Sequence, residues 1–158
     1  MGKVVAIIPS RLESSRLPRK ALVDILGMPM IVHVFKRCLF AKKLDEVYVA
    51  TDSIEIKEVV ESFGGKVIMT SSEHETGTDR IAEAAQTIAA DIIVNVQGDE
   101  ALVNPQYIDK VVSALQESPQ TNVAILVNPF NKRKYFKKHR PRITRFLLGW
   151  NNSNWCIF

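Results

Sequence analysis

Cysteine is scarce in this sequence, and long apolar runs are missing. Only Cys38 and Cys156 occur in 158 residues, far apart and with no Cys or His at metal-ligand spacing. They favour free thiols in a reducing compartment over a disulfide framework, so we expect a cytoplasmic protein. No run approaches the roughly 18 apolar residues of a membrane span, and the short apolar run after Lys3 does not form a secretory signal.

The familiar phosphate-binding signatures are absent as well. The sequence contains neither G-x-G-x-x-G nor G-x-x-x-x-G-K-[ST]. Their absence argues against a dinucleotide-dependent oxidoreductase and against a P-loop NTPase.

Acidic residues are missing after Glu117. Residues 1–130 hold 17 acidic against 13 basic side chains, a net charge of −4, whereas residues 131–158 hold 8 basic side chains and no acid, a net charge of +8. The pI of about 9.1 therefore reflects the end of the chain and says little about what the body binds.

Short apolar runs alternate with helical patterns up to residue 127, which is typical of an α/β protein. The alternation predicts parallel β-α-β units, and therefore a mostly parallel sheet with flanking helices. The length suits one domain with its own core. We predict strands at residues 4–8, 46–51, 66–70, 91–96 and 121–127, and helices beginning near residues 30, 54, 77 and 105.

Polar clusters follow several of these strands. In open parallel sheets, ligands bind beyond the carboxyl ends of the strands. The loops at that edge are Pro9–Lys20, Asp52–Ser53, Ser71–Thr78 and Gln97–Glu100. Three of the four carry residues suited to chemistry, which favours a functional site over a set of solvated loops.

The first of these loops is basic and rich in hydroxyl groups. Spaced cations and hydroxyls after a strand suit a phosphate, because Arg gives two-pronged contacts and Lys a point charge. The alternative is an exposed basic loop without a ligand. The residues concerned are Ser10, Arg11, Ser14, Ser15, Arg16, Arg19 and Lys20.

The Gln97–Glu100 loop follows the most hydrophobic strand. A carboxylate at Asp99, facing a basic loop, suits Mg²⁺ beside phosphates, and Gly98 lets backbone approach closely. Gln97 can offer a donor and an acceptor to a base edge. The alternatives are that Asp99 or Glu100 caps the helix at Pro105, and that Gln97 is a satisfied polar residue at a strand end.

The third cluster is His74-Glu75-Thr76-Gly77-Thr78-Asp79-Arg80. Thr76 and Thr78 can donate hydrogen bonds at a helix N-terminus, where anions are favoured. We assign His74 no catalytic role. Arg80 could pair structurally with Asp79 or Glu83.

As a set, these motifs resemble the cytidylyltransferases that activate acidic sugars, and most closely the 3-deoxy-manno-octulosonate cytidylyltransferase (CMP-Kdo synthetase) family. The resemblance covers roughly residues 3–127 and implies a Rossmann-like sheet of the nucleotide-diphospho-sugar transferase type. The matching stretches, in the family's order, are residues 8–11, 14–20, 27–31, 49–52, 74–80 and 94–100.

The resemblance implies transfer of CMP from CTP to 3-deoxy-manno-octulosonate (Kdo) with release of pyrophosphate, for lipopolysaccharide biosynthesis. It implies that the triphosphate is held by Ser10, Arg11, Ser15, Arg16 and Lys20. Around the cytidine it places Thr76, Gly77, Thr78 and Gln97. It implies Mg²⁺ on Asp99, and catalytic roles for Arg16, Lys20 and Asp99.

Residues 129–158 depart from the family. We divide the chain into a nucleotide-binding half, residues 1–128, and an atypical basic tail without a regular hydrophobic period. A frame-shifted, non-native end is one interpretation, and a tail binding nucleic acid or a membrane is the other. Family members are longer homodimers, so we expect an incomplete fold whose sheet ends at the fifth strand, half an active site, and little turnover.

Two alternatives to Kdo activation stay open. One is a cytidylyltransferase for another sugar acid, of the neuraminate type. The other is a non-catalytic nucleotide-binding module. We expect neither a nucleic-acid partner nor membrane insertion.

Overall fold

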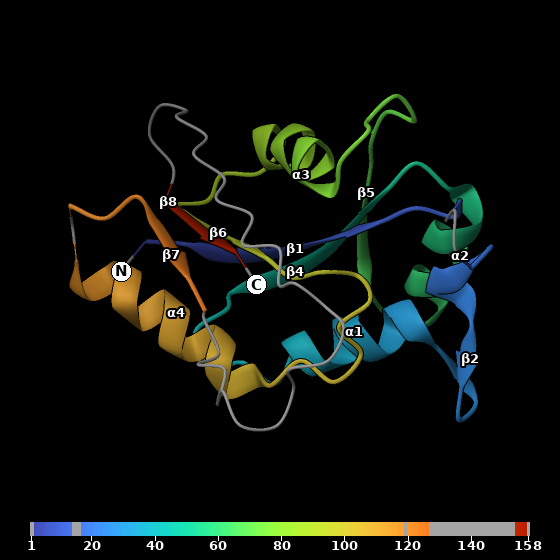
Figure 1. The fold of residues 1–158 in the computed structure, drawn as a ribbon, viewed down its shortest axis with the longest axis horizontal. Coiled ribbons are helices and arrows are strands. Elements are labelled where there is room, and N and C mark those ends of the chain that lie inside the picture. Colours follow the sequence, from blue (N-terminus) through green and yellow to red (C-terminus); the bar gives the residue numbers. More distant parts are fainter. Residues whose placement is uncertain (1, 14–16, 119, 127–153, 158) are drawn as a thin grey trace, which may run out of the picture.

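A six-stranded parallel sheet forms the centre of the molecule (Figure 1). The computed structural model describes residues 2–13, 17–118, 120–126 and 154–157. The strand order is β5-β4-β1-β6-β8-β7, and every neighbouring pair in this sheet is parallel. The predicted α/β class with a mostly parallel sheet is confirmed. The strands are β1 (Val4–Ser10), β4 (Glu46–Thr51), β5 (Lys66–Met69), β6 (Ile92–Asn95), β7 (Val123–Ile125) and β8 (Asn154–Ile157).

Helices cover both faces of this sheet. Helix α3 lies on one face, and α1 and α4 lie on the other (Figure 1). Buried side chains of α2 belong to the same core cluster as those of α1 and α4. The helices are α1 (Met30–Cys38), α2 (Ile54–Ser62), α3 (Gly77–Gln86) and α4 (Pro105–Glu117).

Strand β1 divides the core into two parts. All seven of its residues are buried, and successive side chains of a strand point to opposite faces. Val4, Ala6 and Ile8 join the larger core under α1, α2 and α4, whereas Val5 and Ile7 join the smaller core under α3. A strand that is apolar on both faces belongs in the middle of a parallel sheet.

Three helices begin at a side-chain cap. The side chain of Ser53 accepts a hydrogen bond from the backbone N–H of Ile56 at the start of α2, and Thr76 caps α3 in the same way. Asn104 caps α4. The alternative that Asp99 or Glu100 caps this helix is therefore wrong.

A short hairpin and a 3-10 turn precede α1, and neither was predicted. The turn is η1 (Lys20–Leu22), and the hairpin pairs β2 (Asp24–Ile25) with β3 (Met28–Pro29) in antiparallel fashion. Leu26 and Gly27, between the two strands, both have positive φ, as a tight two-residue hairpin turn requires. This turn could not be predicted from the sequence, because Leu26 stands where Asn or Gly is usual.

The sheet still ends at the predicted fifth strand, β7, but it contains a further strand that the sequence did not predict, β8. Strand β8 lies between β6 and β7, so the predicted fifth strand is not the neighbour of β6. Residues 154–157 of the tail form this strand although their sequence has no regular hydrophobic period. The rest of residues 129–158 lies outside the described residues, and the division at residue 128 stays a prediction. In the described part of the chain, no helix is both long and apolar enough to cross a bilayer.

Candidate functional site

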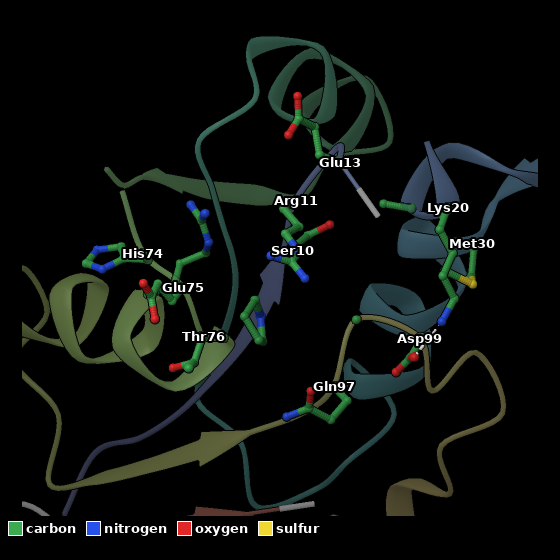
Figure 2. A pocket seen from close by; sticks show the side chains of 15 residues that line it. Ser10, Arg11, Glu13, Lys20, Met30, His74, Glu75, Thr76, Gln97 and Asp99 are labelled. Carbon is green, nitrogen blue, oxygen red and sulfur yellow. Dashed lines mark hydrogen bonds and ion pairs between the residues drawn. The ribbon is translucent and has the colours of Figure 1, made fainter. Parts of the chain in front are cut away.

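A cleft of about 240 Å³ opens where β1 and β6 end, and it gathers three of the predicted loops. Figure 2 shows His74, Glu75 and Thr76 on one side of Ser10 and Arg11, with Lys20, Met30 and Asp99 on the other. The expectation that polar loops meet at the carboxyl edge of the sheet is thus confirmed. The lining residues are Pro9, Ser10, Arg11, Glu13, Lys20, Ala21, Met30, His74, Glu75, Thr76, Gly77, Arg80, Gln97, Gly98 and Asp99.

Pro9 is the packing point between these loops. A Cβ on Gly98 would lie 2.6 Å from the Pro9 carbonyl oxygen, a distance that real side chains do not tolerate. A Cβ on Gly77 would lie 3.2 Å from Cγ of the same proline. Gly98 therefore allows close approach, as predicted, and the group it approaches is the backbone of the first loop.

Lys20 and Asp99 form an ion pair across the cleft. Lys20 Nζ lies 2.6 Å from Asp99 Oδ2, and both side chains stay partly exposed. The pair joins η1 to the loop after β6, residues 79 apart in sequence. The predicted phosphate cation and the predicted metal carboxylate therefore neutralise each other in this structure.

Not every cation of the first loop turns to the cleft. Arg19 pairs with Glu55 of α2 and does not line the cleft, so a contact between Arg19 and phosphate stays a prediction. Arg11 and Ser10 do line it. Ser15 and Arg16 lie outside the described residues, and their roles stay predictions.

Gln97 is held by the last residue of β6. Its Nε2 donates to Asn95 Oδ1 over 3.0 Å, and Asn95 is almost fully buried. One N–H of the Gln97 amide is thereby used inside the protein. The carbonyl oxygen and the second N–H remain as the acceptor and donor that the sequence suggested.

The start of α3 forms the opposite wall. Thr76 Oγ1 accepts from the Asp79 N–H at 3.1 Å and donates to the Asp79 carboxylate at 2.6 Å. Thr76 and Gly77 line the cleft, whereas Thr78 does not. The expectation that Thr76 serves a helix N-terminus is confirmed, and a ligand contact by Thr78 stays a prediction.

His74 is tied to α3 through Glu83. Its Nε2 contacts Glu83 Oε2, and the same oxygen accepts from the Ser71 N–H at 2.9 Å. The His74 contact, followed by the Ser71 hydrogen bond, holds the pKa of the Glu83 carboxyl below its usual range. His74 lines the cleft, and its described partner is a carboxylate that fixes the loop.

Arg80 has partners that the sequence did not indicate. Its Nη2 lies 3.2 Å from Asp52 Oδ2, and its Nη1 donates to Thr70 Oγ1 at 2.5 Å. The alternative that Arg80 pairs with Asp79 or Glu83 is therefore wrong. Asp52 follows β4 and Thr70 follows β5, so only the strand order brings them together.

The oxygen donors in the cleft fit a hard divalent cation only in part. Within residues 2–13, 17–118 and 120–126, no three His, Cys, Asp or Glu side chains cluster closely enough to hold a metal alone. Mg²⁺ commonly takes one or two carboxylates together with phosphate oxygens, and Asp99 meets that need. Glu13 and Glu75 also line the cleft, which the sequence patterns did not suggest.

Known proteins resemble most of this chain. A sequence profile of the family described as cytidylyltransferase matches residues 5–146. A 3-deoxy-manno-octulosonate cytidylyltransferase of Geobacter sulfurreducens is 52% identical over 123 residues, which are 78% of this chain and 49% of that protein. One from Escherichia coli is 45% identical over 126 residues, covering 80% of this chain and 51% of the relative.

A solved structure shares the fold as well. It is a CMP:2-keto-3-deoxy-manno-octonic acid synthetase complexed with CTP, which superposes with a TM-score of 0.76 at 43% identity. The match covers 78% of this chain and 52% of that one. The chain thus spans about half the length of the curated relatives it matches.

Proposed function

Because this chain belongs to the cytidylyltransferase family, we propose that it is the nucleotide-binding half of an enzyme that transfers CMP from CTP to Kdo. The reaction joins the anomeric hydroxyl of the sugar to the α-phosphate of CTP and releases pyrophosphate. The observation that carries the proposal is the meeting of Arg11, Lys20, Gln97 and Asp99 in one cleft, at the sheet edge where this kind of fold binds ligands.

Kdo is the acceptor we propose because both curated relatives described above are named for it rather than for neuraminate. The acceptor site and turnover are proposed for the whole protein, since this chain spans about half of those relatives. Lipopolysaccharide biosynthesis follows from the use of Kdo. The scarcity of cysteine supports a cytoplasmic location.

The triphosphate would lie along the first loop. Arg11 and Lys20 supply positive charge there, and Ser10 supplies a hydroxyl at the end of β1. Arg16 and Ser15 belong to the same proposed set. Two-pronged guanidinium contacts fix a phosphate in place, whereas the Lys20 ammonium can follow it as charge shifts.

The cytidine would lie between Gln97 and the start of α3. The amide of Gln97, oriented by Asn95, can pair with a base edge. Thr76 and Gly77 would bound the nucleoside on the other side, with Thr78 next to them.

Asp99 would hold Mg²⁺ together with phosphate oxygens of CTP. When bound, the ion would supply positive charge to the α-phosphate and to the departing pyrophosphate. Lys20 pairs with Asp99 in this structure, so a contact between Lys20 and phosphate would require Lys20 to exchange that carboxylate for a phosphate oxygen. We therefore expect metal and nucleotide to bind together rather than separately.

In the reaction, the chain's own residues would orient CTP and neutralise its negative charge. Arg11 and Lys20 would stabilise the negative charge that accumulates on pyrophosphate as the sugar oxygen attacks in line. Donors fixed before the reaction cost no reorganisation when that charge develops. Arg16 is the third cation proposed for this task.

Calorimetric titration with CTP, with and without Mg²⁺, tests the proposal. We expect Mg²⁺ to strengthen CTP binding to this chain and Asp99→Ala to remove that gain, about tenfold or more, since charge-assisted contacts are lost. Glu100→Ala is the matched control, because Glu100 is the neighbouring carboxylate and does not line the cleft. If Asp99→Ala keeps the full Mg²⁺-dependent gain, the metal assignment is wrong. If the unaltered chain binds no CTP, the proposed function is wrong.

A further inference from the structure

We propose that Arg80 is a positioning residue, which holds the nucleoside wall of the cleft in place through Asp52 and Thr70. The inference rests on the proposed function, because that wall is the one assigned to cytidine. Arg80 is the most deeply buried charged side chain in the described part of the chain, with 3% of its surface exposed. A buried guanidinium is retained only where its hydrogen bonds are satisfied.

The two contacts of Arg80 use different nitrogens of one planar group. Nη1 donates to Thr70 Oγ1, and Nη2 faces Asp52 Oδ2 at 3.2 Å. Both partners stand directly after strands, Asp52 after β4 and Thr70 after β5. These strand ends are also joined by the Thr70 N–H, which donates to the Thr51 carbonyl at 2.9 Å. Arg80 therefore anchors one helix to two strand ends at once.

The anchored helix carries the cleft wall. Arg80 lies in the first turn of α3, and its N–H donates to the Thr76 carbonyl at 3.3 Å. Thr76 and Gly77, in that same turn, line the cleft, as does Arg80 itself, whose two described side-chain contacts go to Thr70 and Asp52. Gly77 is also packed against Pro9. The first turn is thus held at two points, by Pro9 on the β1 side and by the Arg80 contacts on the side of β4 and β5.

Only arginine suits this arrangement. Its planar fork presents two donors in fixed directions, whereas an ammonium is a single flexible point of charge. Arg80 also neutralises Asp52. Without Arg80, the Asp52 carboxylate would be unpaired near a site for a triphosphate. Asp52 does not itself line the cleft, so it affects nucleotide binding through its ion pair with Arg80 or through the charge of its carboxylate, and not by contact.

Amide hydrogen exchange in the nucleotide-free chain, together with calorimetric titration with CTP and Mg²⁺, tests the role. The variants are Arg80→Met, Arg80→Lys and Asp52→Asn. Ile81→Val is the control, because Ile81 is the next residue of α3, is fully buried and belongs to the smaller apolar core. We expect all three variants of Arg80 and Asp52 to speed exchange at residues 79 and 80, whose N–H groups donate to Thr76, and to weaken CTP binding by about tenfold or more. Ile81→Val should lower the melting temperature and leave CTP affinity unchanged.

The outcomes distinguish a positioning role of Arg80 from a purely structural role and from direct contact with the nucleotide. If Arg80→Met and Asp52→Asn lower the melting temperature but bind CTP as the unaltered chain does, Arg80 is merely structural and the inference fails. If Arg80→Met weakens CTP binding without changing exchange, and Asp52→Asn does nothing, Arg80 contacts the nucleotide directly and the inference also fails. Should Arg80→Met not fold, Arg80→Lys and Asp52→Asn decide. If the unaltered chain binds no CTP, the proposed function fails, whereas unchanged exchange at residues 79 and 80 would still refute the anchoring.

Discussion

The carboxylate of Glu46 forms ion pairs with lysines from two other segments of the chain. Lys3 Nζ lies 2.5 Å from Oε2, and Lys66 Nζ lies 2.6 Å from Oε1. Hydrogen bonds from Lys3 and then from Lys66 lower the pKa of Glu46 to about 2. The same contacts raise the pKa values of both lysines. This group joins the N-terminus, β4 and β5 at the edge of the sheet opposite the cleft.

The lowered pKa of Glu46 predicts an acid-sensitive contribution to stability. Folding favours the ionised carboxylate, so its contribution is complete above the unfolded pKa of about 4.5 and is lost as pH falls through about 2. We expect Glu46→Gln to melt below the unaltered chain near pH 6, and the gap to close between pH 5 and 2. Melting curves at several pH values measure it. Glu58→Gln is the control, at an exposed site on α2 outside every described ion pair, and it should not lower the melting temperature in this way. If Glu46→Gln still melts below the unaltered chain by the same amount at pH 2, the lowered pKa of Glu46 is contradicted.

Residue types at the site could be predicted from the sequence, but their partners could not. Lys20 and Asp99 were expected in one site because each follows a strand, and the structure joins them. The sequence offered Asp79 and Glu83, within its own helix, as alternative partners of Arg80, and Glu83 is three residues away, where helical neighbours meet. The partner of Arg80 is Asp52 instead, because β4 lies between β1 and β5 and places its end beside α3.

At the scale of elements, helix starts were the most predictable feature. Ser53 and Thr76 carry the hydroxyl groups that cap helices, and both do so here. The hairpin of β2 and β3 was not predictable, because Leu26 adopts a positive φ that its side chain disfavours. The next residue, Gly27, is a usual turn residue. A single glycine two positions before Pro29 does not specify a hairpin, however.

Thr76 is predicted to serve both helix α3 and the cleft, and its substitution separates the two. Thr76→Val keeps the shape and removes the hydroxyl, so it should cost about 1 kcal/mol of stability, as lost caps do. Asn104→Ala should cost a similar amount at α4, outside the cleft. Urea unfolding and CTP titration compare them. We expect only Thr76→Val to weaken CTP binding, and Thr76→Ser to preserve both stability and CTP affinity. Equal CTP affinities for Thr76→Val and Asn104→Ala would show that Thr76 is not part of the site.

At the scale of the whole molecule, the order of strands decides where the site lies. Pro9 ends up between Gly98 and Gly77 because β1 is central and β6 is its direct neighbour. The sequence predicted parallel strands but not their order, since hydrophobic patterns mark burial and not adjacency. The insertion of β8 between β6 and β7 had no signal at all, because those residues show no clear alternation.

The same order predicts unequal stability across the sheet. Strand β1 is buried along its length and pairs on both sides, whereas β5 pairs only with β4 and exposes both of its ends. Amides with the most buried surroundings open only on global unfolding, and edge elements open locally. We expect amide exchange in the centre of β1 to be slower than in β5 by about a hundredfold or more. Exchange followed by mass spectrometry at low urea measures it, with β4, which pairs on both sides, as the internal control. Equal protection of β1 and β5 would mean that the sheet opens only as one unit. The loops that meet at Pro9 would then owe their fixed positions to global stability rather than to a rigid central strand.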